Sequence, residues 1–125
     1  MTENEIAKIV LDKAFEIHRS LGPGLLESVY EKALEYELVH SQIFVVSQMP
    51  VPMIYKEIKF EAGFRLDLLV ENKVIVEVKA LENLAPVHFA QTLTYLKLSG
   101  RKLGLLINFN TKYLKDGIHR IANNL

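Results

Sequence analysis

The sequence predicts a mixed α/β (α+β) fold in which helices flank a mixed β-sheet, with the elements in the order ααβββαβ. Up to residue 41, apolar residues recur every three or four positions, which is typical of two amphipathic helices. From Ile43 onward, β-branched and aromatic residues predominate, which favours strands. A further helical segment separates the last two apolar runs, and such a crossover allows the strands on either side to lie parallel.

The first predicted helix covers residues 4–21 and ends at Gly22-Pro23-Gly24, which breaks the helix and restarts the chain. The apolar stripe of this helix consists of Ile6, Ile9, Val10, Ala14, Ile17 and Leu21. A second helix runs to about residue 41, and its stripe consists of Leu26, Val29, Tyr30, Ala33, Leu34 and Leu38. The first two elements are therefore an αα pair.

The first strand is predicted to be interrupted. Residues 43–49 and 51–55 are rich in β-branched and aromatic residues, but Pro50 cannot donate to a sheet ladder and neither can Pro52. These prolines favour a position at the sheet edge or a bulge. Lys56-Glu57 then gives a turn signal, so the next strand is expected to return alongside this one.

The next strand segments lie on either side of a glycine. Residues 58–60 form a short segment, and after Gly63 residues 64–70 form another. Asn72-Lys73 is the following turn signal. Residues 74–80 are then strongly apolar on both faces, which is typical of a strand in the middle of a covered sheet.

The last third of the chain predicts a crossover and a final buried strand. Pro86 suits the first turn of a helix that runs to about Ser99 and is closed by Gly100. Residues 103–109 follow as a buried strand. The tail is compatible with a short helix or with an edge strand at residues 117–122, and the strand is favoured.

The bulk composition restricts the class of protein. At 125 residues, half of them hydrophobic, residues 1–125 are expected to form one compact domain. The absence of cysteine excludes a disulfide framework and a thiolate metal site, so a metal would need oxygen or imidazole ligands. The chain starts without a signal-peptide pattern and has no membrane-spanning apolar run, which predicts a cytoplasmic protein.

Charge is balanced over the whole chain. Fifteen Lys and Arg residues face fifteen Asp and Glu residues, so no global field recruits nucleic acid by charge alone. Any phosphate partner must therefore be bound by a local group of residues.

Charged residues interrupt two predicted core strands. Alternation along residues 74–79 places Glu77 and Lys79 on one face. In the preceding strand, Asp67 shares a face with Arg65 and Leu69, while the other face carries Leu66, Leu68 and Val70. Burying an ion costs several kcal/mol unless it is paired or bound to a metal, so these residues are candidates for a site. The alternative is a buried ion pair that only fixes the register of the strands.

The loop between the two strands decides whether the carboxylates meet. A two-residue turn at residues 72–73 would place Asp67 and Glu77 on opposite faces of the sheet. A three-residue loop, Glu71-Asn72-Lys73, would pair Val70 with Val74 and bring the two carboxylates together on one face. We predict the three-residue loop, with Asn72 or Lys73 in the left-handed region.

Asp67 followed by Glu77-Val78-Lys79 resembles the D…(D/E)-x-K signature of the PD-(D/E)XK nuclease superfamily. The predicted order ααβββαβ is similar to the restriction-endonuclease-like core of that superfamily. Three longer segments, residues 21–31, 65–70 and 91–97, look like the GxxExxR protein family, and the likeness covers roughly residues 5–122. Gly24 and Glu27 fit the name-giving pattern, whereas Tyr30 stands where that pattern has Arg.

The resemblance implies roles for individual residues. Asp67, Glu77 and the Val78 carbonyl would hold Mg²⁺ or Mn²⁺, which prefer oxygen ligands. The residues implied as catalytic are Lys79, Glu27 and Gln91. By their position on or after the third predicted helix, the candidates for substrate contacts are Tyr95, Lys97 and Arg101. The alternative interpretations are a core aromatic for Tyr95 and a solvated helix end for Lys97 and Arg101.

The resemblance therefore implies a magnesium-dependent phosphodiesterase or nuclease that hydrolyses DNA or RNA with metal-activated water. Its expected partner is nucleic acid, and no membrane partner is expected. Two alternatives stay open: a non-catalytic nucleic-acid or protein binding module that retains the nuclease fold, and a subunit of a larger nuclease system. The oligomeric state is also open, with a homodimer among the alternatives.

Overall fold

The computed structural model describes all residues from Met1 to Leu125. The elements follow one another as α1 (Glu3–Leu21), α2 (Glu27–His40), β1 (Val45–Tyr55), β2 (Ile58–Val70), β3 (Val74–Lys79), α3 (Pro86–Ser99), β4 (Leu103–Asn108), the 3₁₀ helix η1 (Leu114–Gly117) and β5 (Ile118–Ala122). The predicted order ααβββαβ is confirmed, and the tail forms the strand that the sequence favoured. A 3₁₀ turn precedes that strand.

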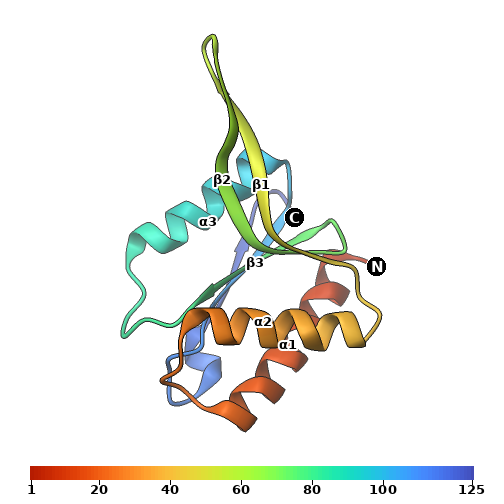
Figure 1. The fold of residues 1–125 in the computed structure, drawn as a ribbon, viewed down its shortest axis with the longest axis vertical. Coiled ribbons are helices and arrows are strands. Elements are labelled where there is room, and N and C mark those ends of the chain that lie inside the picture. Colours follow the sequence, from red (N-terminus) through yellow and green to blue (C-terminus); the bar gives the residue numbers. More distant parts are fainter.

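The five strands form one mixed sheet in the order β1-β2-β3-β4-β5 (Figure 1). The crossover through α3 makes β3 and β4 parallel, and the other neighbouring strands are antiparallel. Helices α1 and α2 pack on one face of the sheet, while α3 packs on the opposite face. The predicted fold class, a mixed sheet flanked by helices, is therefore confirmed.

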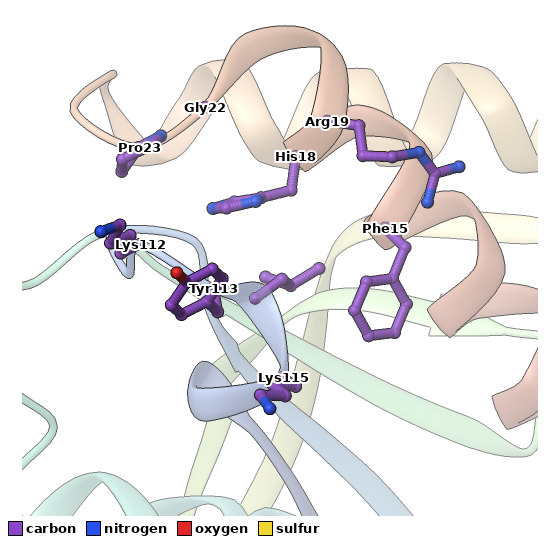
Figure 2. Close-up of a pocket in the computed structure, with 9 residues that line it drawn as sticks. Phe15, His18, Arg19, Gly22, Pro23, Lys112, Tyr113 and Lys115 are labelled. Carbon is purple, nitrogen blue, oxygen red and sulfur yellow. The ribbon is translucent and has the colours of Figure 1, made fainter.

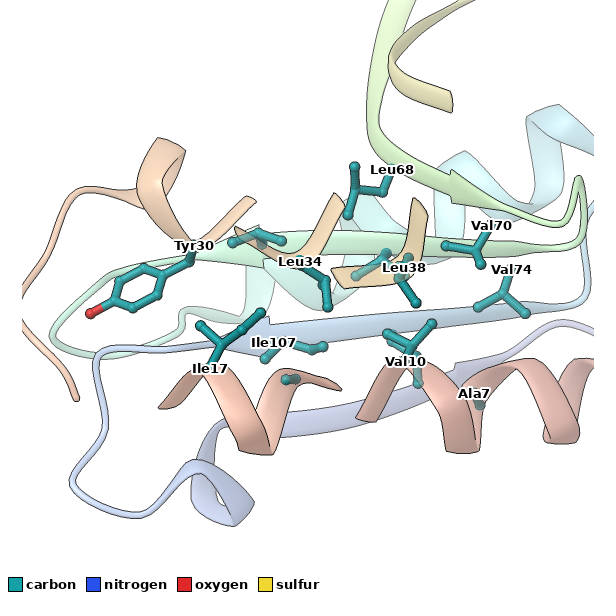
Figure 3. Close-up of a cluster of buried hydrophobic side chains, with 14 of the residues drawn as sticks. Ala7, Val10, Ile17, Tyr30, Leu34, Leu38, Leu68, Val70, Val74 and Ile107 are labelled. Atoms are coloured by element: carbon teal, nitrogen blue, oxygen red, sulfur yellow. The ribbon is translucent and has the colours of Figure 1, made fainter. Parts of the chain in front are cut away.

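The larger core lies between the αα pair and the sheet. It contains 18 buried residues, because the apolar stripes of both helices meet the apolar face of β2, β3 and β4. Figure 3 shows Val10 of α1 and Leu38 of α2 close to Val70 and Val74 of the sheet. Full burial of one Val, Leu, Ile or Phe side chain stabilises the fold by roughly 1.5 to 3 kcal/mol, so the contacts on this face anchor the sheet.

The smaller core lies under α3. Leu96 of that helix packs with Leu69 and Ile75, on the sheet face that also carries the charged residues. Leu66 belongs to this cluster too. The sequence predicted that Leu66 shares a face with Leu68 and Val70, and this prediction is wrong because strict alternation is interrupted at Asp67, where β2 separates from β3.

The β1–β2 hairpin extends beyond the rest of the sheet (Figure 1). As the prolines predicted, β1 is an edge strand, and its register with β2 shifts between Val51 and Met53. The strand β2 runs without a break through Gly63, so the expected division into two segments is not found. A Cβ at Gly63 would meet Met53 Cγ at 2.1 Å, and glycine therefore lets Met53 cross over the strand.

The loop between β2 and β3 has the predicted register. Val70 pairs with Val74, and Leu69 pairs with Ile75, as the three-residue loop requires. Asn72 has a φ of 57°, in the left-handed region, as expected. Glu71 shares this conformation with a φ of 52°, whereas Lys73 does not adopt it. If the register of these pairs is continued by one residue, Asp67 lies opposite Glu77, and both side chains are on the same face of the sheet.

The ends of the helices follow local sequence signals. Thr2 and Glu5 form a capping box at the start of α1. As predicted, the third helix begins at Pro86 and ends before Gly100. Gly100 takes the left-handed conformation. None of the three helices has the length and apolar character needed to cross a bilayer.

Candidate active site

The charged residues of β2 and β3 meet where the two strands separate. Backbone pairing of these strands stops at Leu68 and Val76. Beyond this point the Asp67 amide donates to Glu77 Oε2 at 2.9 Å, and the Val78 amide donates to Asp67 Oδ2 at 2.9 Å. Two side-chain carboxylates thus replace the next rungs of the ladder, and they are held close together by the backbone.

Glu77 is buried, with only 3% of its surface exposed, and it lies near a second carboxylate. Burial and the charge of Asp67 raise the pKa of Glu77 to about 8, although the Asp67 amide and the Lys79 ammonium act in the opposite direction. A carboxylate in this position is therefore electrostatically unfavourable unless a proton or a cation offsets its charge.

Lys79 follows Glu77 by two residues, so both belong to the same face of β3. The side chain is half-buried, and it makes no ion pair with any carboxylate. Its main-chain carbonyl accepts a hydrogen bond from the Phe109 amide at 2.9 Å, which ties the end of β3 to the end of β4. The ammonium is therefore available to a ligand at the carboxylates.

Glu27 reaches the same region from the start of α2. Partial burial and the charge of Asp67 raise the pKa of Glu27, while Lys79 and His88 lower it. The turn before Glu27 is held by Tyr30, whose hydroxyl donates to the Gly22 carbonyl at 2.6 Å and accepts from the Leu25 amide at 3.1 Å. The Tyr30 ring is buried and stacks on Phe109 with 4.7 Å between centroids. Tyr30 thereby fixes the entry into α2 that carries Glu27.

Two further residues of this region were not predicted from the sequence. Gln48 Nε2 donates to both Glu31 carboxylate oxygens, at 3.1 and 2.9 Å, and lies 3.4 Å from Asp67 Oδ1. Burial raises the pKa of Glu31, and the charges of Asp67 and Glu27 act in the same direction. The spacing of Glu31, one turn after Glu27, was a signal that could have revealed it. Gln48 becomes visible only once the register of β1 against β2 is known.

The third helix contributes Tyr95. Its ring stacks on Phe64 of β2 with 4.4 Å between centroids. Burial, Glu77 and Asp67 raise the pKa of Tyr95, so the phenol lies within the electrostatic influence of the carboxylates. Gln91 is one turn earlier on α3, and its side chain is exposed and makes no hydrogen bond.

The remaining predicted contacts lie farther from the carboxylates. Lys97 is exposed in the last turn of α3. The guanidinium of Arg101 donates to the Ser99 carbonyl and to Asn72 Oδ1, at 3.0 and 2.7 Å. Because Asn72 precedes β3 whereas Lys79 ends it, Arg101 lies at the other end of this strand. The structure therefore brings together the residues of β2, β3 and the start of α2, but it does not bring Arg101 to them.

The chemistry of the donor set suits a hard cation. The charge of Asp67 raises the pKa of Glu27, Glu31 and Glu77, and Lys79 is the one ammonium close to this group. No group of three or more His, Cys, Asp or Glu residues is arranged to hold a metal ion in the structure, and Asp67 and Glu77 each use one oxygen for a backbone amide while the other oxygen stays free of such a bond. Carboxylate and carbonyl oxygens are the ligands that Mg²⁺ prefers. The residue types therefore fit a divalent cation.

A mixed sheet between helices, with two carboxylates and a lysine where neighbouring strands separate, defines a nuclease-like fold. Among models of known protein families, the one described as PD-(D/E)XK nuclease superfamily matches residues 4–121. The protein belongs to the PD-(D/E)XK nuclease superfamily. No curated protein and no solved structure matches the chain.

Proposed function

We propose that the protein is a phosphodiesterase that hydrolyses DNA or RNA with a divalent cation, Mg²⁺ or Mn²⁺. Asp67, Glu77 and the Val78 carbonyl would hold the cation. The observation that carries this proposal is the convergence of two carboxylates at the point where β2 leaves β3, with the Lys79 ammonium unpaired beside them. Membership of a superfamily of nucleases supports the same reaction class.

Each residue of the site has a role that follows from its chemistry. When bound, a divalent cation lowers the pKa of water and offsets the negative charge of a phosphate in the transition state. The Lys79 ammonium would orient the attacking water and stabilise the developing charge on the phosphate. Glu27 and Gln91 would orient the water or the phosphate from the flanking helices. Tyr95 would contact the substrate from α3.

The phosphate backbone of a longer substrate would extend away from the carboxylates. Lys97 is the exposed cation nearest in sequence to Tyr95 at the end of α3, and Arg101 follows it. Phosphate contacts of this kind position a strand without reading its sequence. We therefore assign Lys97 and Arg101 to substrate binding outside the reacting centre.

The test is cleavage of labelled DNA and RNA in the presence of Mg²⁺ or Mn²⁺. We expect Asp67→Asn, Glu77→Gln and Lys79→Ala to lower the cleavage rate by about 100-fold or more. The matched controls are Glu61→Gln and Lys59→Ala, which change exposed residues of the distal part of β2. These controls should cleave at the wild-type rate. Equal cleavage by all five variants and the wild type would mean that the activity comes from elsewhere.

A second candidate is a binding module that keeps the nuclease fold without cleavage. One observation favours it: both carboxylates already accept backbone hydrogen bonds, so they also serve the structure of the β2–β3 junction. The two candidates differ in the fate of a bound strand. An enzyme shortens the labelled strand when Mg²⁺ is added, whereas a binding module retains it at full length.

The proposal also covers the family of the protein, its location, its partner and its oligomeric state. We assign the chain to the GxxExxR protein family on its Gly24 and Glu27 pattern, and we expect one cytoplasmic domain over residues 1–125 that binds nucleic acid. A subunit of a larger nuclease system and a homodimer are compatible with the same site. Size-exclusion chromatography with light scattering distinguishes a monomer from a homodimer.

A further inference from the structure

The largest cavity of the molecule lies apart from the carboxylates, between the end of α1 and the segment that follows β4 (Figure 2). Its volume is about 560 Å³, within the range of roughly 300 to 1,000 Å³ that is typical of small-molecule sites. It is lined by Phe15, His18, Arg19, Gly22, Pro23, Lys112, Tyr113, Leu114 and Lys115. None of the residues assigned to the proposed cleavage reaction lines this cavity.

The lining of this cavity is cationic, although the chain has a net charge of zero. Arg19, Lys112 and Lys115 contribute three positive charges, and His18 is a fourth basic residue. No Asp or Glu lines the cavity, and the two ion pairs of the molecule, Lys8–Asp12 and Lys13–Glu16, lie outside its lining. A local group of unpaired cations of this kind favours an anionic ligand.

The floor of the cavity is apolar and offers flat rings. Leu114 is buried and Phe15 is half-buried, whereas the Tyr113 ring is 57% exposed. Figure 2 shows His18 on the α1 side of the cavity and Tyr113 across from it. The Lys112 ammonium lies 5.5 Å from the centroid of the Tyr113 ring, so a cation and an exposed ring occupy the same part of the rim.

A hydrogen bond between segments that are distant in the sequence joins two walls of the cavity. His18 Nε2 donates to the Thr111 carbonyl at 2.8 Å, which ties the last turn of α1 to the chain that carries Lys112 and Tyr113. The buried Leu114 packs into the larger core from the same segment. The fold therefore fixes the backbone of the segment that carries Lys112, Tyr113 and Lys115.

We propose that this cavity binds a nucleotide, with the base against Tyr113 and the phosphate held by Lys112 beside that ring, while Arg19 and Lys115 add positive charge on other sides of the cavity (Figure 2). A ligand that suits the lining needs a flat unsaturated ring together with several negative charges, and a nucleotide has both. The nucleotide is either free or the phosphorylated end of a nucleic-acid strand. The site does not depend on the proposed cleavage reaction.

The test is calorimetric titration with adenosine 5′-monophosphate and with a short 5′-phosphorylated oligonucleotide. EDTA is present throughout, so a divalent cation at Asp67 and Glu77 does not contribute to binding. We expect Tyr113→Ala to weaken binding by about 10-fold, the effect of losing one stacked base. Lys112→Gln should weaken binding by about 5-fold through the loss of a charge-assisted contact, and Lys115→Gln should weaken it by less, because that variant removes a more distant positive charge.

The controls match each variant in exposure and chemistry. Tyr55 is 59% exposed at the far end of β1, so Tyr55→Ala removes an equivalent ring without touching the cavity. Lys56→Gln removes an exposed lysine outside the lining that lies 5.5 Å from the centroid of the Tyr55 ring, as Lys112 does from Tyr113. Both control variants should bind the nucleotide as the wild type does. Circular dichroism establishes that the rim variants, all exposed residues, keep the fold.

The outcomes distinguish the source of the nucleotide and can overturn the proposal. Binding of the free mononucleotide points to a small ligand, while binding of the oligonucleotide alone points to the end of a strand, and both support the site. Two further titrations use inorganic phosphate, an anion without a base, and laurate, an anion with an apolar chain and no ring. If either of them bound as tightly as the mononucleotide, a nucleotide site would be contradicted. Equal losses in Tyr113→Ala and Tyr55→Ala, or no binding to the wild type, would also overturn it.

Discussion

Two carboxylates take the place of backbone partners where β2 leaves β3. Asp67 and Glu77 each accept an amide hydrogen bond, and this exchange holds like charges together in a largely buried position. This arrangement has an electrostatic cost for Glu77. Burial and the charge of Asp67 raise the pKa of Glu77 to about 8. Without a cation, the folded protein therefore prefers to keep a proton on this site at neutral pH.

This arrangement predicts how stability depends on pH. Because the folded pKa of Glu77 lies above the value of 4.5 for an ordinary glutamate, the unfolded chain loses the proton first as pH rises. In EDTA, the free energy of unfolding should fall by a few kcal/mol between about pH 4.5 and about pH 8. Glu27 and Glu31 have raised pKa values as well and contribute in the same direction. Urea unfolding at several pH values measures the change.

Glu77→Gln isolates the residue that causes this dependence. Glutamine cannot ionise, so most of the loss of stability across this pH window should disappear in the variant. Glu61→Gln, in the exposed part of β2, should keep the wild-type dependence. A wild-type protein that is equally stable at both ends of the window would show that Glu77 is not buried as described.

At the scale of elements, the turn between α1 and α2 determines where Glu27 lies. Gly22 ends α1 with a positive φ of 68°, and the Tyr30 hydroxyl bridges Gly22 and Leu25 across the turn. The sequence marked Tyr30 as part of an apolar stripe, and its ring is indeed buried. Its hydroxyl contacts could not be predicted, because they depend on how the turn folds back over α2.

Tyr30→Phe tests this function of the turn. The variant keeps the ring that stacks on Phe109 but leaves the Gly22 carbonyl and the Leu25 amide without their partner. We expect the free energy of unfolding to fall by about 1 to 3 kcal/mol. Thermal unfolding measures this loss. Tyr36→Phe, in the same helix at an exposed position, should have no measurable effect, and an equal loss in both variants would contradict the account.

The strands show which parts of the sheet a sequence can specify. Alternation in residues 74–79 and the three residues between the strands were sufficient to predict that Val70 pairs with Val74. The same reasoning failed for Leu66, because alternation assumes a regular ladder and the carboxylates of Asp67 and Glu77 interrupt it. The contact of Gln48 with Glu31 also escaped prediction, since it requires the register of a bulged hairpin.

At the scale of the whole molecule, helices cover both faces of the sheet, and the proposed active site lies between these layers at the end of β3. The αα pair anchors one face through the larger core, and α3 covers the other. Glu27 and Tyr95 approach the carboxylates from these two layers. Order and fold class followed from the sequence. The position of Arg101 at the other end of β3 is a consequence of the parallel crossover, because Arg101 precedes β4 and Leu103 pairs with Val74 at the start of β3.

The proposed function requires that Asp67 and Glu77 bind a divalent cation. Calorimetric titration with Mn²⁺ at about pH 8 measures this binding directly. We expect the wild type and Glu61→Gln to bind the cation equally well. Asp67→Asn should bind it at least about 10-fold more weakly, because one of the two carboxylate ligands is lost. The same affinity in Asp67→Asn, or the absence of binding to the wild type, would contradict it.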